Sequence, residues 1–198
     1  RILPMVWKIN SGIKDDFLAN LLRQRRLVLE TAIFKMESLA KLLDGEDLKH
    51  LRYTLIYTTD KDPSQLEQVN DFLNARGLLF HQLTEEETRS REKTSKILSS
   101  FQDGQLQILT AKRVLDEGVN IPQIKKAFIL ASTTVKRQWV QRRGRLLRTC
   151  EEIKKTHAVI HDFVPLPPGC KESEVIKLDQ DVRRYLRAER DRVWEFAR

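Results

Sequence analysis

Short apolar segments alternate with amphipathic segments along the middle of the chain. Five short runs rich in apolar and β-branched residues predict strands, at 54–59, 78–83, 106–110, 126–131 and 157–161. Three intervening segments have the spacing of amphipathic helices, at 63–77, 87–101 and 135–148. Strands that alternate with helices form βαβ units, in which neighbouring strands run parallel. The pattern therefore predicts an α/β fold, a three-layer α/β/α arrangement around a mostly parallel sheet.

Long amphipathic segments flank this region on both sides. Residues 15–43 carry apolar side chains at three-to-four spacing, which predicts one long helix that stops near Gly45. Arg25 interrupts the apolar stripe, so a bend or a division into two helices fits the pattern as well. A proline-rich loop at 165–169 precedes a final amphipathic helix predicted over 172–196. Long helices are therefore expected before and after the sheet.

Composition and charge narrow the class of protein. Hydrophobic residues make up 40% of the 198 residues, enough for a globular core rather than a disordered tail. The chain has 36 Lys and Arg against 28 Asp and Glu, a net charge of +8. This excess favours polyanionic partners such as nucleic acid or nucleotides. A generically basic protein explains the charge equally well, so charge alone decides nothing.

Cysteine usage and hydropathy set further limits. Cys150 and Cys170 form neither a zinc-ligand spacing nor a disulfide framework, and they fit a reducing, cytoplasmic setting, or a nuclear one in a eukaryote. His157 and His161 have no cluster of carboxylates or thiols beside them in the sequence, so no metal site is expected. No apolar run is long enough for a membrane helix. The chain opens on Arg1 rather than Met, and we expect it to be part of a longer protein.

The arginine-rich segment before residue 150 has the strongest chemical signal. On a helix, Gln141, Arg145 and Arg148 share one face because they are spaced i, i+4, i+7. Four apolar residues are expected on the opposite face, against the sheet: Trp139, Val140, Leu146 and Leu147. Guanidinium groups grip phosphate through a planar fork. The alternative is an arginine-rich surface helix. Residues 135–150 contain no Asp or Glu that would neutralise the arginines, which favours phosphate binding.

Three segments carry a family resemblance. Residues 141–148 resemble motif VI of superfamily-two helicases, the QRxGRxxR pattern. Residues 109–122 resemble motif V of the same family, and residues 54–59 resemble motif IV. The resemblance covers about residues 50–165, and it is closest to the DNA-directed branch that includes repair translocases of the XPB type and restriction-enzyme motors. It implies the second, C-terminal RecA-like motor domain of a helicase or translocase.

The resemblance also assigns roles on the nucleotide side. In this family the second domain closes over an ATP that the first domain holds together with Mg²⁺. Arg148 is then implied as the arginine finger, with Arg145 as its partner and Gln141 in the same cleft. The motif V residues implied to lie near the nucleotide are Glu117, Gly118 and Asn120. The family usually has Asp where this chain has Asn120, which keeps the hydrogen-bonding shape without the charge.

A second set of roles concerns nucleic acid, with DNA expected and RNA not excluded. The residues implied to contact its phosphates are Thr58, Thr59, Thr110, Lys112 and Arg113. Ligands of open α/β sheets bind at the carboxyl ends of the strands, where these residues fall. Two plainer interpretations stay open: the hydroxyls of Thr58 and Thr59 simply finish a strand, and residues 117–122 form an ordinary turn.

The expected organisation is a helical lead-in at 1–50, a RecA-like domain at 51–165 and a C-terminal helical extension at 166–198. The sequence contains no GxxxxGK phosphate loop and no DExx box that follows a strand so as to hold Mg²⁺, because Asp116 and Glu117 fall inside motif V. An N-terminal RecA-like domain of the same chain is expected to supply both, and this chain alone is expected to show no ATP hydrolysis. The alternative is a non-catalytic RecA-like module for nucleic-acid binding or docking. A different α/β phosphate-binding enzyme lacks support, because no nucleophile–base pair accompanies the arginines.

Overall fold

The computed structural model describes residues 16–59, 61–112, 119–131 and 136–165, and short pieces between 180 and 194. Its helices are α2 (Asp16–Glu30), α3 (Phe34–Asp44), α4 (Pro63–Ala75), α5 (Glu85–Thr88), α6 (Arg91–Gln102) and α7 (Lys136–Leu146). Its strands are β1 (Thr54–Tyr57), β2 (Phe80–Leu83), β3 (Ile108–Ala111), β4 (Lys126–Ile129) and β5 (Val159–Asp162). All five predicted strands are present, each within a few residues of its predicted position.

The five strands form one sheet in the order β2-β3-β1-β4-β5, and every neighbouring pair is parallel. β1 is central: Thr54 is in register with Ile108 of β3 on one side and with Lys126 of β4 on the other. Because the strands are parallel, each connection must cross from the carboxyl end of one strand to the amino end of the next. The predicted α/β fold with a mostly parallel sheet is confirmed.

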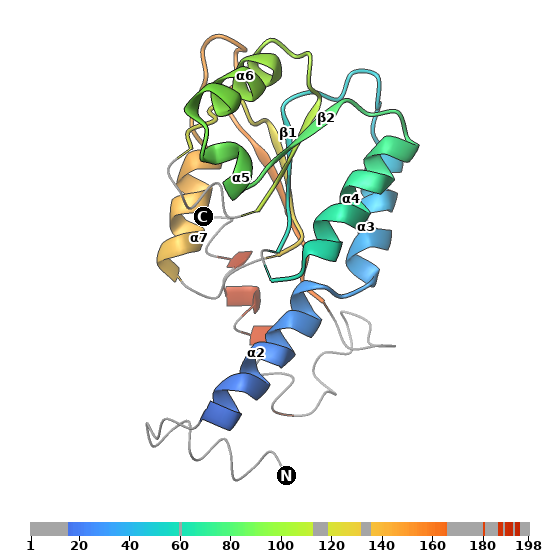
Figure 1. Cartoon of the computed structure of the whole chain (residues 1–198), viewed down its shortest axis with the longest axis vertical. Helices are drawn as coiled ribbons and strands as arrows, with labels where there is room; N and C mark the ends of the chain where they lie inside the picture. Colours follow the sequence, from blue (N-terminus) through green and yellow to red (C-terminus); the bar gives the residue numbers. More distant parts are fainter. Residues whose placement is uncertain are drawn as a thin grey trace.

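Helices cover both faces of the sheet, with α3 and α4 on one side and α5, α6 and α7 on the other (Figure 1). Side chains alternate along β1: Leu55 and Tyr57 join the core beneath α6 and α7, and Ile56 joins the core beneath α3 and α4. The α6–α7 side includes the fully buried Phe101 and Leu146. Two apolar cores thus fix α7 and α4 against opposite faces of the same strands.

The N-terminal helical region differs from the single helix predicted over 15–43. It is divided into α2 and α3 at residues 31–33, and Arg25 lies within α2 rather than at the break. Leu39 and Leu43 of α3 are fully buried in the core against β1, β3 and β4. The cover of this sheet face therefore includes α3, whose residues precede position 51.

Two other helical predictions also changed. The helix predicted over 87–101 is divided in two, because Thr84 caps α5 in a capping box with Glu87 and Ser90 caps a new helix, α6. Most of the final helix predicted over 172–196 lies outside the described residues. The two capping residues were visible in the sequence, but each competes with the continuous three-to-four pattern that predicted a single helix.

Candidate functional site

Helix α7 runs back along the sheet toward the amino ends of β4 and β5 and ends at Leu146. Arg145 lies on this helix, whereas Arg148 follows two residues after its end, although the helix predicted over 135–148 included it. The last residue of α7, Leu146, offers its carbonyl oxygen to the Lys155 Nζ at 2.7 Å, and the same Nζ donates to the carbonyl of Pro122 at 2.8 Å. Pro122 precedes β4 in the chain, and Lys155 precedes β5. The arginine end of α7 therefore lies beside the loop that enters β4, and Lys155 ties the two together.

This arrangement brings Asn120, Arg145 and Arg148 into one group. The Arg145 Nη1 donates to the carbonyl of Val119 at 3.1 Å, and the Arg148 Nη1 donates to the Asn120 Oδ1 at 2.5 Å. Arg148 and Asn120 are exposed, Arg145 is half-buried, and Gln141 is exposed one turn earlier on the helix. Each guanidinium uses one donor in these hydrogen bonds, and its other N–H groups are not part of them.

The expected apolar face of α7 is wrong in part. Leu146 is fully buried, but Val140 and Leu147 are 38% and 43% exposed. The buried position next to Leu146 is taken by Arg142, which is 6% exposed and whose guanidinium lies 4.2 Å from the centroid of the Tyr57 ring. The side chain of Trp139 lies outside the described part of the chain.

The helix is rotated so that positions 142 and 146, one turn apart, face the sheet. An arginine can occupy such a position because its aliphatic stem packs on apolar surface and its planar head lies over an aromatic ring. The i, i+4 spacing of Arg142 with Leu146 was a signal in the sequence. It was missed because an arginine was assigned to the solvent side.

Lys155 is a second residue that the sequence did not single out. Its side chain is buried, with 3% of its surface exposed, although lysine is usually a surface residue. The pKa of Lys155 is lowered to about 8, mainly by burial, with the nearby Cys150 acting in the opposite direction and Lys125 adding to the lowering. Cys150 is itself buried and pairs with Lys155 through backbone hydrogen bonds. Lys155 is the second of two adjacent lysines, and no pattern in the sequence indicates that it, rather than Lys154, is buried.

The carboxyl ends of β1 and β3 hold the predicted nucleic-acid threonines, and their hydroxyls are buried with partners inside the protein. The Thr110 Oγ1 donates to the Asn70 Oδ1 of α4 at 2.9 Å. The Thr59 Oγ1 donates to the Glu30 Oε2 of α2 at 2.7 Å. The Thr58 Oγ1 has a longer contact, 3.4 Å, with the carbonyl of Ala111. These side chains are 0–2% exposed, so a phosphate could reach them only after a rearrangement.

Lys112 follows β3 and is half-buried at the same edge. It lies close enough to Asp62 to help lower the pKa of that carboxyl group, although the main cause is the hydrogen bonding of Asp62 with Ser64 at the N-terminus of α4. The remaining predicted residues of this loop, Arg113, Glu117 and Gly118, lie outside the described residues.

The candidate residues therefore form two separate groups. Thr58, Thr59, Thr110 and Lys112 lie at the carboxyl edge of the sheet, and Asn120 lies with the α7 arginines near the amino end of β4. The arginine group therefore does not share the carboxyl edge with the threonines. The chain between β3 and β4 must cross the sheet, because the two strands are parallel, and it carries Asn120 away from that edge.

The described residues contain neither a metal-binding cluster nor a helix suited to a membrane. No group of three or more His, Cys, Asp or Glu side chains in them is arranged to hold a metal ion. No described helix is long and apolar enough to cross a membrane. His161 stacks on Phe128, with ring centroids 4.9 Å apart, and burial lowers its pKa. This histidine packs at the margin of the core beside β4.

The family of the chain follows from comparison with known proteins. The model of the helicase conserved C-terminal domain matches residues 34–150, which is more than half of the chain. The chain therefore belongs to this family, and the resemblance to the second motor domain of superfamily-two helicases is confirmed. The match begins at the first residue of α3 and ends just after α7, so it covers the helices that close both faces of the sheet.

Individual relatives agree with this assignment. The chain is 38% identical over 58 residues to the DNA 3'-5' translocase XPB2 of Sulfurisphaera tokodaii, covering 29% of this chain and 13% of that relative. The C-terminal part of the Fun30 ATPase domain is similar in structure, with a TM-score of 0.56 and 15% identity over 75% of this chain and 48% of that one. The C-terminal domain of the DEAD-box protein Dbp5 is also similar in structure, with a TM-score of 0.52 and 16% sequence identity. The match covers 77% of this chain and 78% of the Dbp5 chain. These structures establish the RecA-like fold, and the chain spans less than half of the Fun30 structure.

Proposed function

We propose that this chain is the C-terminal motor domain of an ATP-dependent nucleic-acid helicase or translocase that acts on DNA. The observation that carries the proposal is the group formed by Arg145, Arg148 and Asn120. Two guanidiniums are anchored at one surface, each through a hydrogen bond to the loop that precedes β4. The membership in the helicase C-terminal domain family and the similarity to a DNA translocase support the same conclusion.

The proposed chemistry is the stabilisation of charge during phosphoryl transfer. The first motor domain would hold ATP and Mg²⁺, and the α7 surface would close over the γ-phosphate. Arg148 would exchange its neutral partner, the Asn120 amide, for a phosphate oxygen, and Arg145 would position the loop and share the charge. Phosphoryl transfer is accelerated mainly by positioning and by fixed positive charge, so an arginine in this place suits the reaction.

Asn120 has a defined part in this proposal. An aspartate at this position would form an ion pair with Arg148 and would neutralise part of its charge. The neutral amide oxygen accepts a hydrogen bond and leaves the full charge on the guanidinium. The departure from the family pattern at this position therefore keeps Arg148 oriented and leaves it available to an anionic ligand.

The test uses the intact protein that carries both motor domains. We expect Arg148→Ala to lower nucleic-acid-stimulated ATP hydrolysis by about 10³-fold or more, with ATP binding largely retained. Arg91→Ala, which removes an exposed arginine from α6, is the matched control and should leave hydrolysis unchanged. Hydrolysis at the wild-type rate in the Arg148 variant would exclude the arginine-finger role.

The second candidate function is a non-catalytic module that binds nucleic acid or docks to a partner. The buried state of Thr58, Thr59 and Thr110 is the observation that favours it, because no hydroxyl of this set faces outward. The sequence that precedes this chain in its gene separates the two: a phosphate-loop lysine and a DExx box there support the motor. In either case we propose that the 198-residue chain alone has no ATPase activity above background, since it carries neither of these elements.

A further inference from the structure

The last turn of α2 is fastened to the carboxyl edge of the sheet through a buried glutamate. Glu30 is 6% exposed, and its two carboxylate oxygens have different partners: the hydroxyl of Thr59 at 2.7 Å and the ammonium of Lys61 at 2.9 Å. The backbone carbonyl of Glu30 also accepts from the Gln65 Nε2 at 2.7 Å, and Gln65 in turn accepts from the Thr59 amide. The carboxylate thus fills a small polar site made by residues that directly follow β1.

The donors around this carboxylate suit a phosphate group equally well. A hydroxyl and an ammonium each offer one N–H or O–H to an anionic oxygen, which is the common way in which side chains hold a nucleic-acid phosphate. The amide of Lys61 donates to the Thr59 Oγ1, so the Thr59 hydroxyl keeps its own proton for the Glu30 carboxylate. Helix α4 begins at Pro63, and its N-terminus adds partial positive charge near the site. The Asp62 carboxylate, which caps this helix, offsets part of that charge.

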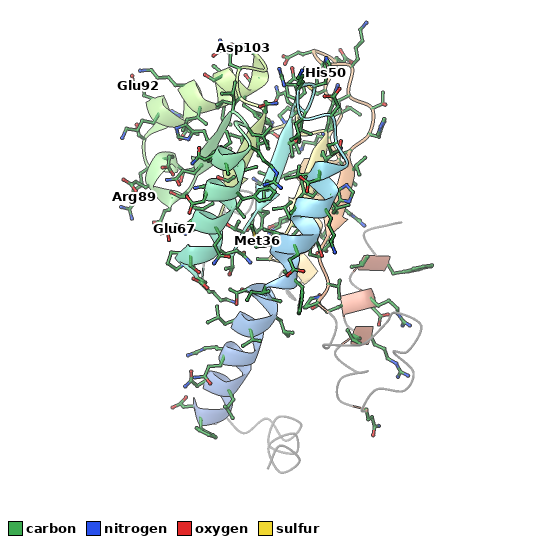
Figure 2. All side chains as sticks on the ribbon, turned by 90° about the vertical axis from the view of Figure 1, so that its right-hand side faces the viewer. Met36, His50, Glu67, Arg89, Glu92 and Asp103 are labelled. Carbon is green, nitrogen blue, oxygen red and sulfur yellow. The ribbon has the colours of Figure 1, made fainter. Side chains whose placement is uncertain are left out.

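Glu30 is poorly placed for the stability of its own helix. It is the last residue of α2, where the helix dipole disfavours a negative charge, and this last turn has no basic residue. The rest of α2 extends away from the sheet, as both views show (Figures 1 and 2), and Phe17 and Val28 on it are exposed. The contacts of Glu30 therefore explain its position better than local helix preference does.

We propose that Thr59 and Lys61 form a binding site for a nucleic-acid phosphate, and that the Glu30 carboxylate occupies this site until nucleic acid displaces it. Lys61 is a binding residue that motif IV did not indicate. The exchange of one anion for another keeps the site neutralised throughout, and it couples nucleic-acid binding to release of the last turn of α2. The inference rests on the proposed function for the identity of the polyanion, but the Glu30 contacts do not depend on it.

The exchange predicts that neutralising Glu30 strengthens nucleic-acid binding by the 198-residue chain. Glu30→Gln keeps an oxygen that can accept from Thr59 and removes the charge that competes with phosphate. With a fluorescent oligodeoxythymidine strand as the probe, we expect about three- to tenfold tighter binding and a steeper salt dependence, by about one phosphate contact. Glu37→Gln on α3 removes the same charge from an exposed position, and it should change the affinity by less than about twofold.

A double variant separates release of Lys61 from a general change in charge. In the Glu30→Gln background, Lys61→Gln should return the affinity to that of the wild-type chain or weaker, because the freed ammonium is then absent. If Glu30→Gln binds the strand no better than Glu37→Gln does, the inference is wrong while the proposed function stands. If no variant, the wild-type chain included, binds DNA or oligouridine, the proposed nucleic-acid contact itself fails.

One measurement needs no substitution at Glu30 and therefore does not depend on how a variant folds. Hydrogen exchange of the backbone amides near residues 27–31 reports the last turn of α2, where the Thr31 amide donates to the Leu27 carbonyl. We expect exchange there to become faster when the oligonucleotide binds to the wild-type chain. Unchanged or slower exchange in this turn, under conditions in which the strand is bound, would overturn the proposed displacement.

Discussion

Each end of the sheet has a buried lysine that donates to backbone carbonyl groups, but the polar side chains near the two lysines differ in exposure. At the carboxyl end, Lys35 of α3 donates to the Leu130 carbonyl at 2.5 Å, and the threonine hydroxyls beside it are buried with internal partners. At the other end, Lys155 joins the Leu146 and Pro122 carbonyls, and the neighbouring Arg148 is exposed. The first end is closed and the second is open, so a ligand must displace buried contacts at one end and only the exposed Asn120 amide at the other.

The largest effect on stability is expected at the anchor of the open end. Lys155→Met leaves the carbonyls of Leu146 and Pro122 without their buried donor, and we expect a loss of about 3 kcal/mol in the free energy of unfolding. Urea denaturation near neutral pH measures it. Lys154→Met, which replaces the exposed neighbour, should stay within about 0.5 kcal/mol of the wild type. A Lys155 variant as stable as this control would mean that the arginine end of α7 is held by other contacts.

The pH dependence of stability gives a second, smaller test of the same anchor. The pKa of Lys155 is lowered to about 8 in the folded chain, from its ordinary value of 10.5 in the unfolded chain. Between these values the unfolded chain binds one more proton than the folded chain, so this residue adds stability as the pH rises. From about pH 7 to about pH 9.5, the stability difference between wild type and Lys155→Met should widen by roughly 2 kcal/mol. A constant difference across this range would contradict the lowered pKa.

The smallest effects compare one hydrogen bond from each end. Thr110→Val keeps the shape of the side chain but leaves the buried Asn70 Oδ1 without its donor, and we expect a loss of about 1 kcal/mol. Asn120→Ala removes the exposed partner of Arg148, and water replaces it, so we expect a change of less than about 0.5 kcal/mol. Thermal unfolding of the two variants side by side measures both. If both variants lose the same free energy of unfolding, the buried and the exposed hydrogen bond contribute equally to stability, and the two ends do not differ in this respect.

The sequence predicted the strands better than the helices, whose divisions and buried faces differed in part from the prediction. The strand runs were short, apolar and bounded by turn residues, and each was found in the parallel sheet. The sequence left open a division of residues 15–43 into two helices, but the break lies at 31–33 rather than at Arg25, and the apolar spacing does not reveal that position. On α7, Arg142 replaced Val140 and Leu147 at the buried positions, because the Tyr57 ring offers a guanidinium a partner that is absent from the local sequence.

In the candidate site, too, the sequence indicated some residues and not others. The sequence placed Arg145 and Arg148 on one helical face, since helical spacing is a local property of the chain. It did not indicate Lys155 or Glu30, whose partners lie many residues away: Lys155 reaches Pro122, and Glu30 reaches Thr59 and Lys61. Such contacts between distant segments carry no period or motif, so a single sequence cannot reveal them.

The sequence by itself thus determined the alternation of strands and helices, the parallel sheet and the motifs that lie within single segments. Only the tertiary structure decided which polar groups are available to a ligand. Local spacing fixes the direction in which a side chain leaves its own helix or strand, but availability depends on what another segment brings to the same place. Thr59 is buried because α2 brings Glu30 to it, and Arg148 is exposed because the loop before β4 meets it with a single amide.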